Sequence, residues 1–493
     1  MIRFLEILPG ALAWGTLTLL LVLSWQAPVF VVVFIILFDL YWFLKLLYLY
    51  IHLRYAFVRM KQNEKKDWLE MLRKDFSRDW EDITHLVVLP VYKEPYDIVQ
   101  GALQSLSESN YPNEKFCVLL AFEAREEEKN RDIEARAIRE FGNSFRKLFS
   151  SFHPADIPGE LPGKGSNDSW AVRKFKEEYI DPEKIPYESI ITSVFDADTR
   201  PGGEYFGVLT HAFLSHPDRQ HASYQPIPVF TNNVHHVSPF ARLIGFSSTF
   251  WQLMQEARPE QLVTFSSHSM PFKSLVEIGY WHKDIVSEDS RIFFQNLIHH
   301  KGRWSVAPLF YPVYMDAVEG DTFFEAMLNL YKQQRRWAWG IENFPYMASR
   351  FLKSKDIPGR IKRFWILRTL DGFYSWSTSS FVIFLFGWLP NLLGGEQFYS
   401  TLFSYNLPRI TGILLNLSTI GIIVSAFLAL FLLPPHPKNT KFHYLLYLLQ
   451  WALMPFVFIV FGSLPALESQ TRLMLGGKFR LGFWTTPKST AGK

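Results

Sequence analysis

The sequence has almost no cysteine and little net charge. Cys117 is the only cysteine in 493 residues, so no disulfide can form within the chain. No cluster of cysteines and histidines has the spacing of a zinc site. The formal net charge is +4, which is too small to indicate binding to nucleic acid or another polyanion. The chain also lacks internal repeats and low-complexity tracts.

Long apolar runs are present at both ends of the chain. Charged residues make up 20% and aromatic residues 17% of the sequence, which is unusual for a soluble enzyme. Residues 7–23 and 28–51 are apolar and long enough, or nearly so, to cross about 30 Å of hydrocarbon as helices. The first run lacks a charged leader and a small-residue cleavage site, so it is predicted to be an anchor and not a signal peptide.

Basic residues predict the orientation of these spans. Eight Lys and Arg lie between Arg54 and Arg78, which places the middle of the chain in the cytoplasm. We therefore expect an integral protein of the cell (plasma) membrane. Its predicted parts are a transmembrane hairpin at 1–53, a cytoplasmic domain at 54–360 and a C-terminal membrane region with a tail at 361–493.

The C-terminal region repeats the membrane pattern. Residues 362–371 predict a helix lying at the membrane interface. Spans are predicted at 373–392, 410–433 and 444–464. The basic loop 434–441 fits the cytoplasmic side. Three crossings would put the tail outside, whereas its basic residues favour the inside, and Pro455 is consistent with a broken or re-entrant last segment. The side of the tail therefore stays open. The basic residues of the tail are Arg472, Lys478, Arg480 and Lys488.

In the middle domain, apolar strands alternate with helices. Strands are predicted at 85–90, 115–122 and 190–195, helices at 96–107 and 125–149, and a loop at 158–169. This alternation predicts an α/β domain with a doubly wound parallel sheet, a fold suited to nucleotide binding.

Two carboxylates follow the third predicted strand, in Asp196-Ala197-Asp198. Open α/β sheets bind ligands at the carboxyl ends of their strands. Two carboxylates there supply hard oxygen ligands for Mg²⁺ or Mn²⁺, and such a metal can neutralise a nucleotide diphosphate. The alternative is a pair of solvated aspartates in a turn, because this short motif is common.

Four further residues lie where a nucleotide would be bound. Tyr92 and Glu94 follow the first strand, where an aromatic ring can stack on a base and a carboxylate can accept its N–H groups. Glu123 ends the second strand and could face the same base. Lys164 lies between two glycines, where an ammonium can approach a diphosphate. The alternatives are an ordinary turn, a surface glutamate and a mobile surface lysine.

Two later segments carry further polar chemistry. Glu288 and Asp289 precede a probable helix, where they could cap it or where Asp289 could act as a general base. The segment from Gln333 to Gly340 contains adjacent arginines and two tryptophans. Arg336 could clamp a leaving diphosphate and Trp337 could support a sugar ring, or the segment could be a basic-aromatic belt at the membrane.

The order of these motifs resembles that of membrane-bound family 2 glycosyltransferases, such as the cellulose, chitin and hyaluronan synthases. The matching residues span about 85–340. They are Tyr92, Glu94, Glu123, Lys164, Asp196-x-Asp198, Glu288-Asp289 and Gln333-x-x-Arg336-Trp337. Two departures are visible: residues 121–125 stand where the family usually has a paired-aspartate turn, and Ser287 stands in place of a threonine.

The resemblance implies a GT-A fold and an inverting, metal-dependent transfer from a nucleotide sugar, with UDP-sugars favoured over GDP-sugars. It implies that Tyr92, Glu94 and Glu123 hold the base and that Lys164 and Arg336 hold the diphosphate. It also implies that Asp198, helped by Asp196, ligates Mg²⁺ or Mn²⁺. Asp289, with Glu288 beside it, would be the catalytic base, and Gln333 and Trp337 would shape the acceptor site.

Two alternatives concern the activity itself. The favoured acceptor is a growing glycan, which makes the enzyme a polysaccharide synthase, and the competing acceptor is a lipid such as a polyprenyl phosphate. A non-catalytic nucleotide-binding membrane protein is a third possibility, but the three carboxylate sites argue against it. The oligomeric state is not predicted.

Overall fold

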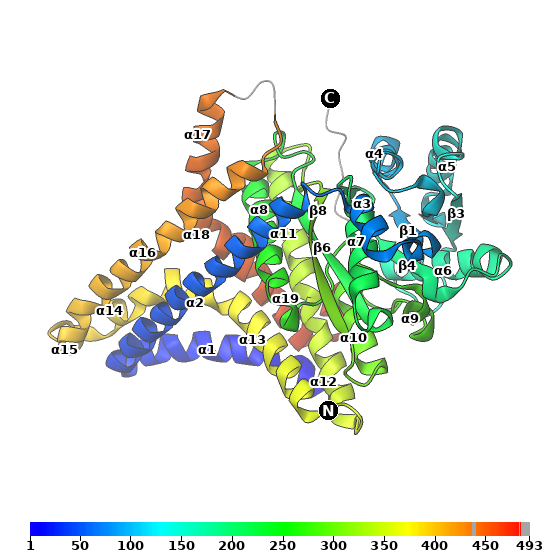
Figure 1. Cartoon of the computed structure of the whole chain (residues 1–493). Coiled ribbons are helices and arrows are strands. Elements are labelled where there is room, and N and C mark those ends of the chain that lie inside the picture. Colours follow the sequence, from blue (N-terminus) through cyan, green and yellow to red (C-terminus); the bar gives the residue numbers. More distant parts are fainter. Residues whose placement is uncertain (436–439, 483, 485–493) are drawn as a thin grey trace.

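The chain forms an α/β domain from which long apolar helices extend on one side (Figure 1). The structure is a computed structural model that describes residues 1–435, 440–482 and 484. Part of the predicted loop 434–441, at residues 436–439, and Lys488 of the tail lie outside the described residues.

The domain is built on one eight-stranded sheet with the order β3-β2-β1-β4-β7-β6-β8-β5. The strands are β1 (Thr84–Val91), β2 (Phe116–Glu123), β3 (Lys147–His153), β4 (Ile190–Val194), β5 (Arg200–Pro201), β6 (Ala222–Phe230), β7 (Ser269–Pro271) and β8 (Ser305–Met315). Strands β3, β2, β1 and β4 are parallel neighbours, and β6 is parallel to β8. Strand β7 is antiparallel to β4 and β6, and β5 is antiparallel to β8.

The sheet is therefore mixed, and the expectation of a wholly parallel sheet is wrong for β5 and β7. These two strands have two and three residues and no apolar run, so the hydrophobic pattern gave no sign of them. All longer strands still point the same way, because β7 reverses direction between β4 and β6. Their carboxyl ends therefore share one edge of the sheet.

The central strands are buried on both faces, as expected for parallel strands covered by helices. In β1, Val87 and Leu89 pack with α4 and α7, whereas Leu86 and Val88 pack with α6 and α10. The helices of the domain are α3 (Trp68–Phe76), α4 (Tyr96–Ser107), α5 (Glu127–Phe141), α6 (Lys164–Phe175), α7 (Tyr205–Ser215), α8 (Pro239–Glu256), α9 (Phe272–Glu277), α10 (Glu288–His299), α11 (Phe323–Ala338) and α12 (Asn343–Lys353).

Two segments differ from the sequence-based expectation. The helix predicted at 125–149 ends at Phe141, and its last residues belong to strand β3. Strand β3 has only two buried residues, so its hydrophobic pattern is weak. The loop predicted at 158–169 becomes helix α6 from Lys164 onward, because packing against the domain outweighs the poor helix propensity of its glycine and serine.

Four described helical segments are long and apolar enough to span a membrane. They are α1 (Ile2–Gln26), α2 (Pro28–Asn63), α16 (Leu402–Leu432) and the segment Lys441–Leu475. A fifth candidate is α13 (Gly359–Phe384) with Phe386–Leu393, which meet at an angle of 45° and include α14 (Leu389–Leu393). The short α15 (Gly395–Tyr399) follows. Residues 362–371 form the first part of α13, so the separate interfacial helix that the sequence predicted is not present.

The last apolar segment is broken near Pro455 and contacts the α/β domain at both ends. It consists of α17 (Lys441–Leu449), a 3₁₀ turn, α18 (Met454–Val457), a π turn and α19 (Leu464–Leu475). Tyr447 shares a hydrogen bond with His235 of the domain at 3.1 Å, and Glu468 accepts one from Arg335 at 2.7 Å. The segment therefore begins and ends beside the domain.

The first turn of α1 also lies against the domain. Leu5 is part of the core cluster that contains β1 and β2, and Glu6 pairs with Arg480 of the tail. The described part of the tail therefore lies beside the start of α1.

Close packing of α1 on α19 gives a prediction about stability. A Cβ at Gly10 would meet the Gln470 carbonyl oxygen at 2.9 Å and Met474 Cβ at 3.0 Å, whereas a Cβ at Gly15 has nothing within 4 Å. We expect Gly10→Val to destabilise the protein by about 1–3 kcal/mol through overpacking. The matched control Gly15→Val should leave the melting temperature in detergent near that of the parent, and equal melting temperatures for both variants would contradict the packing.

Candidate active site

The carboxyl ends of three strands meet at Asp198. This residue follows β4 and is 1% exposed. Its Oδ2 accepts a hydrogen bond from the amide of Asp316, after β8, at 2.8 Å. Its carbonyl oxygen accepts one from the side chain of Asn232, after β6, at 3.1 Å. Asp198 is therefore not a solvated turn residue but a buried carboxylate next to a second aspartate.

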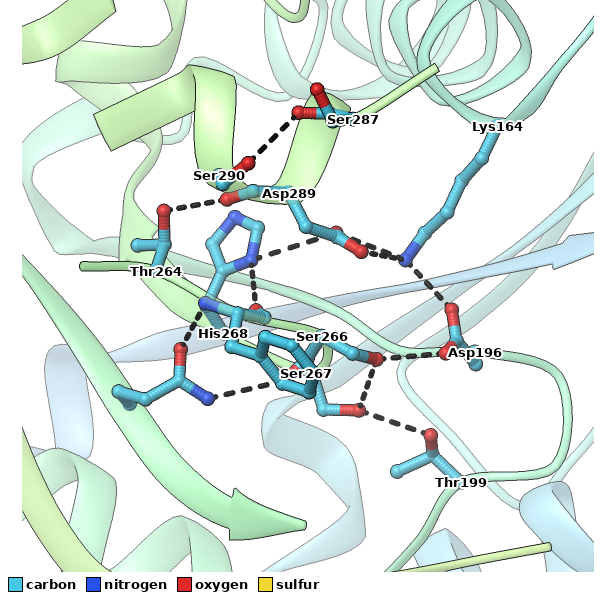
Figure 2. A network of polar contacts seen from close by, with 12 residues as sticks. Lys164, Asp196, Thr199, Thr264, Ser266, Ser267, His268, Ser287, Asp289 and Ser290 are labelled. Carbon is cyan, nitrogen blue, oxygen red and sulfur yellow. Dashed lines mark hydrogen bonds and ion pairs between the residues drawn. The ribbon is translucent and has the colours of Figure 1, made fainter. Parts of the chain in front are cut away.

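Lys164 joins the strand-end aspartates to helix α10 (Figure 2). Its Nζ lies 2.8 Å from Asp196 Oδ1 and 3.1 Å from Asp289 Oδ1. The lysine is only 8% exposed, which excludes a mobile surface residue. Burial disfavours the ammonium, but Asp196 and Asp289 outweigh burial and raise the pKa of Lys164 well above its usual value. The lysine is therefore charged and fixed between two carboxylates.

Gly165 allows helix α6 to approach α10 this closely. A Cβ at this position would meet the His282 carbonyl oxygen at 2.7 Å and Glu288 Cβ at 3.2 Å. The glycine after Lys164 therefore serves close packing, and this packing brings the lysine to the start of α10.

The first turn of α10 carries Glu288 and Asp289. The Asp289 carboxylate faces Lys164, and the Asp289 carbonyl oxygen accepts a hydrogen bond from Thr264 Oγ1 at 2.5 Å (Figure 2). Glu288 is 3% exposed, and burial together with the nearby Asp289 raises its pKa. The two adjacent carboxyl groups thus differ: one faces an ammonium at the site, and the other is enclosed and favours its protonated form.

Ser266 and His268 complete the network, and neither residue was predicted from the sequence. Ser266 Oγ donates a hydrogen bond to Asp196 Oδ2 at 2.7 Å. His268 Nδ1 lies 3.0 Å from the Phe265 carbonyl oxygen and 3.8 Å from Asp289 Oδ1 (Figure 2). Burial lowers the pKa of His268, so its imidazole is neutral. Both residues belong to a short polar run before β7 that matches no motif.

The ends of β1 and β2 bring the predicted base-binding residues together. Arg125 lies with its guanidinium 4.6 Å from the ring centre of Tyr92 and 3.2 Å from Glu123 Oε2. Glu123 is 3% exposed, so it is not a surface glutamate. Glu94 turns back on its own loop, where its Oε2 accepts the amide N–H of Tyr92 at 2.7 Å. Arg125 comes from the segment 121–125 that departs from the resembled family.

The two adjacent arginines of helix α11 have different partners. Arg335 pairs with Glu468 of α19 at 2.7 Å, whereas Arg336 lies near enough to Glu288 to lower the pKa of that carboxyl. Within the described residues, Arg336 Nε has no hydrogen-bond partner although it is buried. Arg336 therefore points toward the carboxylates and has unused donor capacity.

Aromatic packing brings the end of α11 to the same site. Trp337 lies with its ring 6.0 Å from that of Phe230, at the end of β6, and 5.9 Å from that of Phe265. Gln333, one turn earlier, is buried. Trp337 therefore packs between the end of β6 and the polar run before β7.

Asp168 is a further buried carboxyl that the sequence did not single out. It lies one helical turn after Lys164 in α6 and is fully buried. Neither of its carboxyl oxygens has a hydrogen-bond partner in the described part of the chain. Burial raises the pKa of Asp168 well above its usual value, and Glu288 and Asp289 raise it further against the opposing effect of Lys164. Asp168 therefore keeps its proton to a higher pH than an ordinary aspartate does.

No protein-family model and no curated protein sequence matches the chain. Among solved structures, it is similar to the mannosyltransferase PcManGT from Pyrobaculum calidifontis in complex with GDP-Man and Mn²⁺. The identity is 15% and the TM-score 0.38, over 86% of this chain and 99% of that chain. It is also similar to S. aureus TarS 1-349 in complex with UDP-GlcNAc, at 13% identity and a TM-score of 0.37, over 70% of this chain and 91% of that chain.

The raised pKa of Asp168 predicts how stability depends on pH. Because its pKa is higher in the folded chain than the unfolded value of about 3.9, the folded chain binds more protons above about pH 4. The free energy of unfolding that this group contributes therefore falls as pH rises, by up to about 1.4 kcal/mol per pH unit.

Asp168→Asn removes the titration while it keeps the shape. We expect the melting temperature of this variant to rise relative to the parent between about pH 5 and about pH 8. The exposed control Asp132→Asn should show no such trend. A pH-independent difference between Asp168→Asn and the parent would contradict the raised pKa.

Proposed function

We propose that this chain is a membrane-bound family 2 glycosyltransferase with a GT-A fold, which transfers a sugar from a nucleotide sugar with inversion of configuration. One observation carries the proposal: the Lys164 ammonium binds both Asp196, at the end of a strand, and Asp289, at the start of a helix. Its Nζ lies 2.8 Å from Asp196 Oδ1 and 3.1 Å from Asp289 Oδ1. An ammonium flanked in this way is suited to a diphosphate, and a carboxylate next to it is suited to take a proton from a nucleophile.

The donor nucleotide is assigned to the ends of β1 and β2. In this assignment Tyr92 stacks on the base, and Glu94 and Glu123 accept its N–H groups. Arg125 contributes a planar cation that already contacts Tyr92 and Glu123. Its position supports a role in orienting the base. In the resembled family, a paired-aspartate turn stands at this point of the chain.

The diphosphate is assigned to Lys164 and Arg336. Lys164 is buried and charged, and Arg336 Nε has no partner among the described residues. Two cations facing one position supply charge-assisted hydrogen bonds that strengthen as the leaving group gains charge.

Asp198, with help from Asp196, would hold the Mg²⁺ or Mn²⁺ that the resemblance implies. The donor set fits this choice, because Asp198 places a buried carboxylate, a hard oxygen ligand, at the strand ends. When bound, such a cation neutralises charge on a departing diphosphate.

In the proposed transfer, Asp289 takes the proton of an acceptor hydroxyl as its oxygen attacks the anomeric carbon. A bond forms between that oxygen and the sugar, and the bond from the sugar to the diphosphate breaks. Binding of the diphosphate to Lys164 would draw the ammonium away from Asp289 and leave this carboxylate available as the base. His268, neutral and 3.8 Å from Asp289, would help to orient it.

The acceptor is proposed to be a growing glycan, so the enzyme would synthesise a polysaccharide at the plasma membrane from a cytoplasmic donor. Gln333 and Trp337 would form the acceptor site. Both belong to helix α11, which packs on α19 of the last apolar segment. The same closeness to apolar helices also favours a lipid acceptor. The two cases differ in product length, because a lipid acceptor gives a single transfer.

The activity is tested on detergent-purified full-length protein with a panel of UDP- and GDP-sugars, in Mg²⁺ and in Mn²⁺. We expect transfer with one donor, most readily a UDP-sugar. Asp289→Asn should lower kcat by about 10²–10⁴-fold, as expected for loss of a general base, while nucleotide affinity measured by calorimetry stays near that of the parent.

The exposed aspartate Asp284, in the loop before α10, provides the control. Asp284→Asn should keep the parent rate. Transfer by Asp289→Asn at the parent rate would refute the base, and failure of every donor with the parent protein would refute the proposed activity.

The adjacent arginines of α11 offer a matched pair. We expect Arg336→Ala to lower kcat by about 10²–10³-fold, because a donor to the leaving group is lost. Arg335→Ala should instead lower the melting temperature with a smaller effect on kcat, since it removes the partner of Glu468. The two effects are separated by steady-state kinetics and thermal melting, and equal kinetic losses in both variants would contradict the assignment.

A further inference from the structure

A second group of metal-ligating side chains lies at the opposite end of α10 from Asp289. Glu277 ends α9, His299 ends α10 and His300 follows it. One ligand atom of each of these three residues lies within 4.8 Å of the other two. Helix α10 has 12 residues, so this group is about 18 Å along the helix axis from the first turn that carries Asp289.

His300 is the least exposed member and has an unused ring nitrogen. It is 8% exposed, and its Nε2 has no hydrogen-bond partner among the described residues although it is buried. Its ring stacks on that of Trp304 at 5.2 Å, and the indole N–H of Trp304 donates to Ser223. The imidazole is therefore held in place with one nitrogen unsatisfied, which is costly unless a ligand occupies that position.

The surroundings favour a cation. The carbonyl end of α10 faces this group, and the C-terminal end of a helix attracts positive charge. Of the two cations close to the cluster in sequence, Lys301 is paired with Asp356 at 3.2 Å, whereas Arg303 acts electrostatically on His300 and opposes a bound cation. A third imidazole, that of His221, lies 4.7 Å from the ring of His300 and is bonded to Asp218 at 2.6 Å.

We propose that Glu277, His299 and His300 bind a divalent transition-metal ion of the zinc type, which ties the end of α10 to the end of α9. Two imidazoles and one carboxylate match the ligand preference of Zn²⁺, with water completing the coordination. This site is separate from the proposed Mg²⁺ or Mn²⁺ site, which offers only oxygen atoms. Its role is to fix the helix that carries Asp289.

This site could not be predicted from the sequence, because its ligands come from segments that are far apart along the chain. His299 and His300 are adjacent and cannot form a motif by themselves, and Glu277 comes from another helix. Folding of the loop between α9 and α10 brings them together.

The test uses full-length protein in detergent, with any purification tag removed and with metal stripped by a chelator. Zn²⁺ is titrated in competition with a chromophoric chelator, and Co²⁺ is followed by its visible absorption. We expect one Zn²⁺ per chain in an Asp198→Asn background, which removes the other metal site. Zn²⁺ should also raise the melting temperature of this protein.

His299→Ala and Glu277→Gln lie at exposed positions and are expected to fold. Each should weaken Zn²⁺ binding by more than the roughly 10–100-fold that loss of an outer partner costs, and should abolish the Co²⁺ absorption. His443→Ala, at an exposed histidine of α17, is the control and should bind as the parent does.

Equal Zn²⁺ affinity in His299→Ala, Glu277→Gln and His443→Ala would overturn the proposal, and so would absence of binding by the parent. Neither result bears on sugar transfer, because the titration contains no donor or acceptor.

Discussion

The ammonium of Lys164 is the interaction on which the arrangement of the site depends. Two carboxylates that contact the same ammonium would repel each other without it. The Lys164 ammonium between Asp196 and Asp289 replaces this repulsion by attraction. To reach that position the lysine must start a helix, and that helix must touch the first turn of α10. Gly165 permits the contact because a Cβ there would collide with the backbone at His282. The end of β4, the start of α6 and the start of α10 are therefore fixed together.

Much of this could be predicted from the sequence, because parallel strands gather their carboxyl ends at one edge whatever the loops do. The helix expected at 96–107 is present with the same bounds, and the strand-end residues Tyr92, Glu123 and Asp198 lie where the pattern put them. The residues that escaped prediction depend on tertiary contacts. Ser266 and His268 lie in a polar run without a motif. Asp168 differs from an ordinary aspartate only because burial and nearby carboxylates raise its pKa, and these depend on the fold. Strand β3 was not predicted because few of its residues are buried, so its hydrophobic pattern is weak. Helix α6 was not predicted because its glycine and serine content is typical of a loop.

The apolar ends of the chain are part of the same folding unit as the domain between them. Leu5, near the start of α1, and Leu473, near the end of α19, belong to the core cluster that includes Leu86 of β1. Helix α2 continues past residue 53 to Asn63, whose side chain donates hydrogen bonds to carbonyl oxygens of β8 at 3.3 Å. A boundary drawn from hydropathy therefore cuts through one continuous core, and the soluble domain is not expected to be stable without its helices.

The Glu468 carboxylate of the last apolar segment binds two side chains of helix α11. Glu468 of α19 accepts hydrogen bonds from Tyr331 at 2.8 Å and from Arg335 at 2.7 Å, and it also binds Arg472 of its own helix. Arg336 is the next residue on α11 and acts electrostatically on Glu288, whose pKa it lowers. The backbone of α11 therefore connects Arg335, which is bound to α19, with Arg336, which acts on Glu288. A displacement of α19 would therefore be transmitted through α11 to Arg336 and would move its positive charge relative to Glu288.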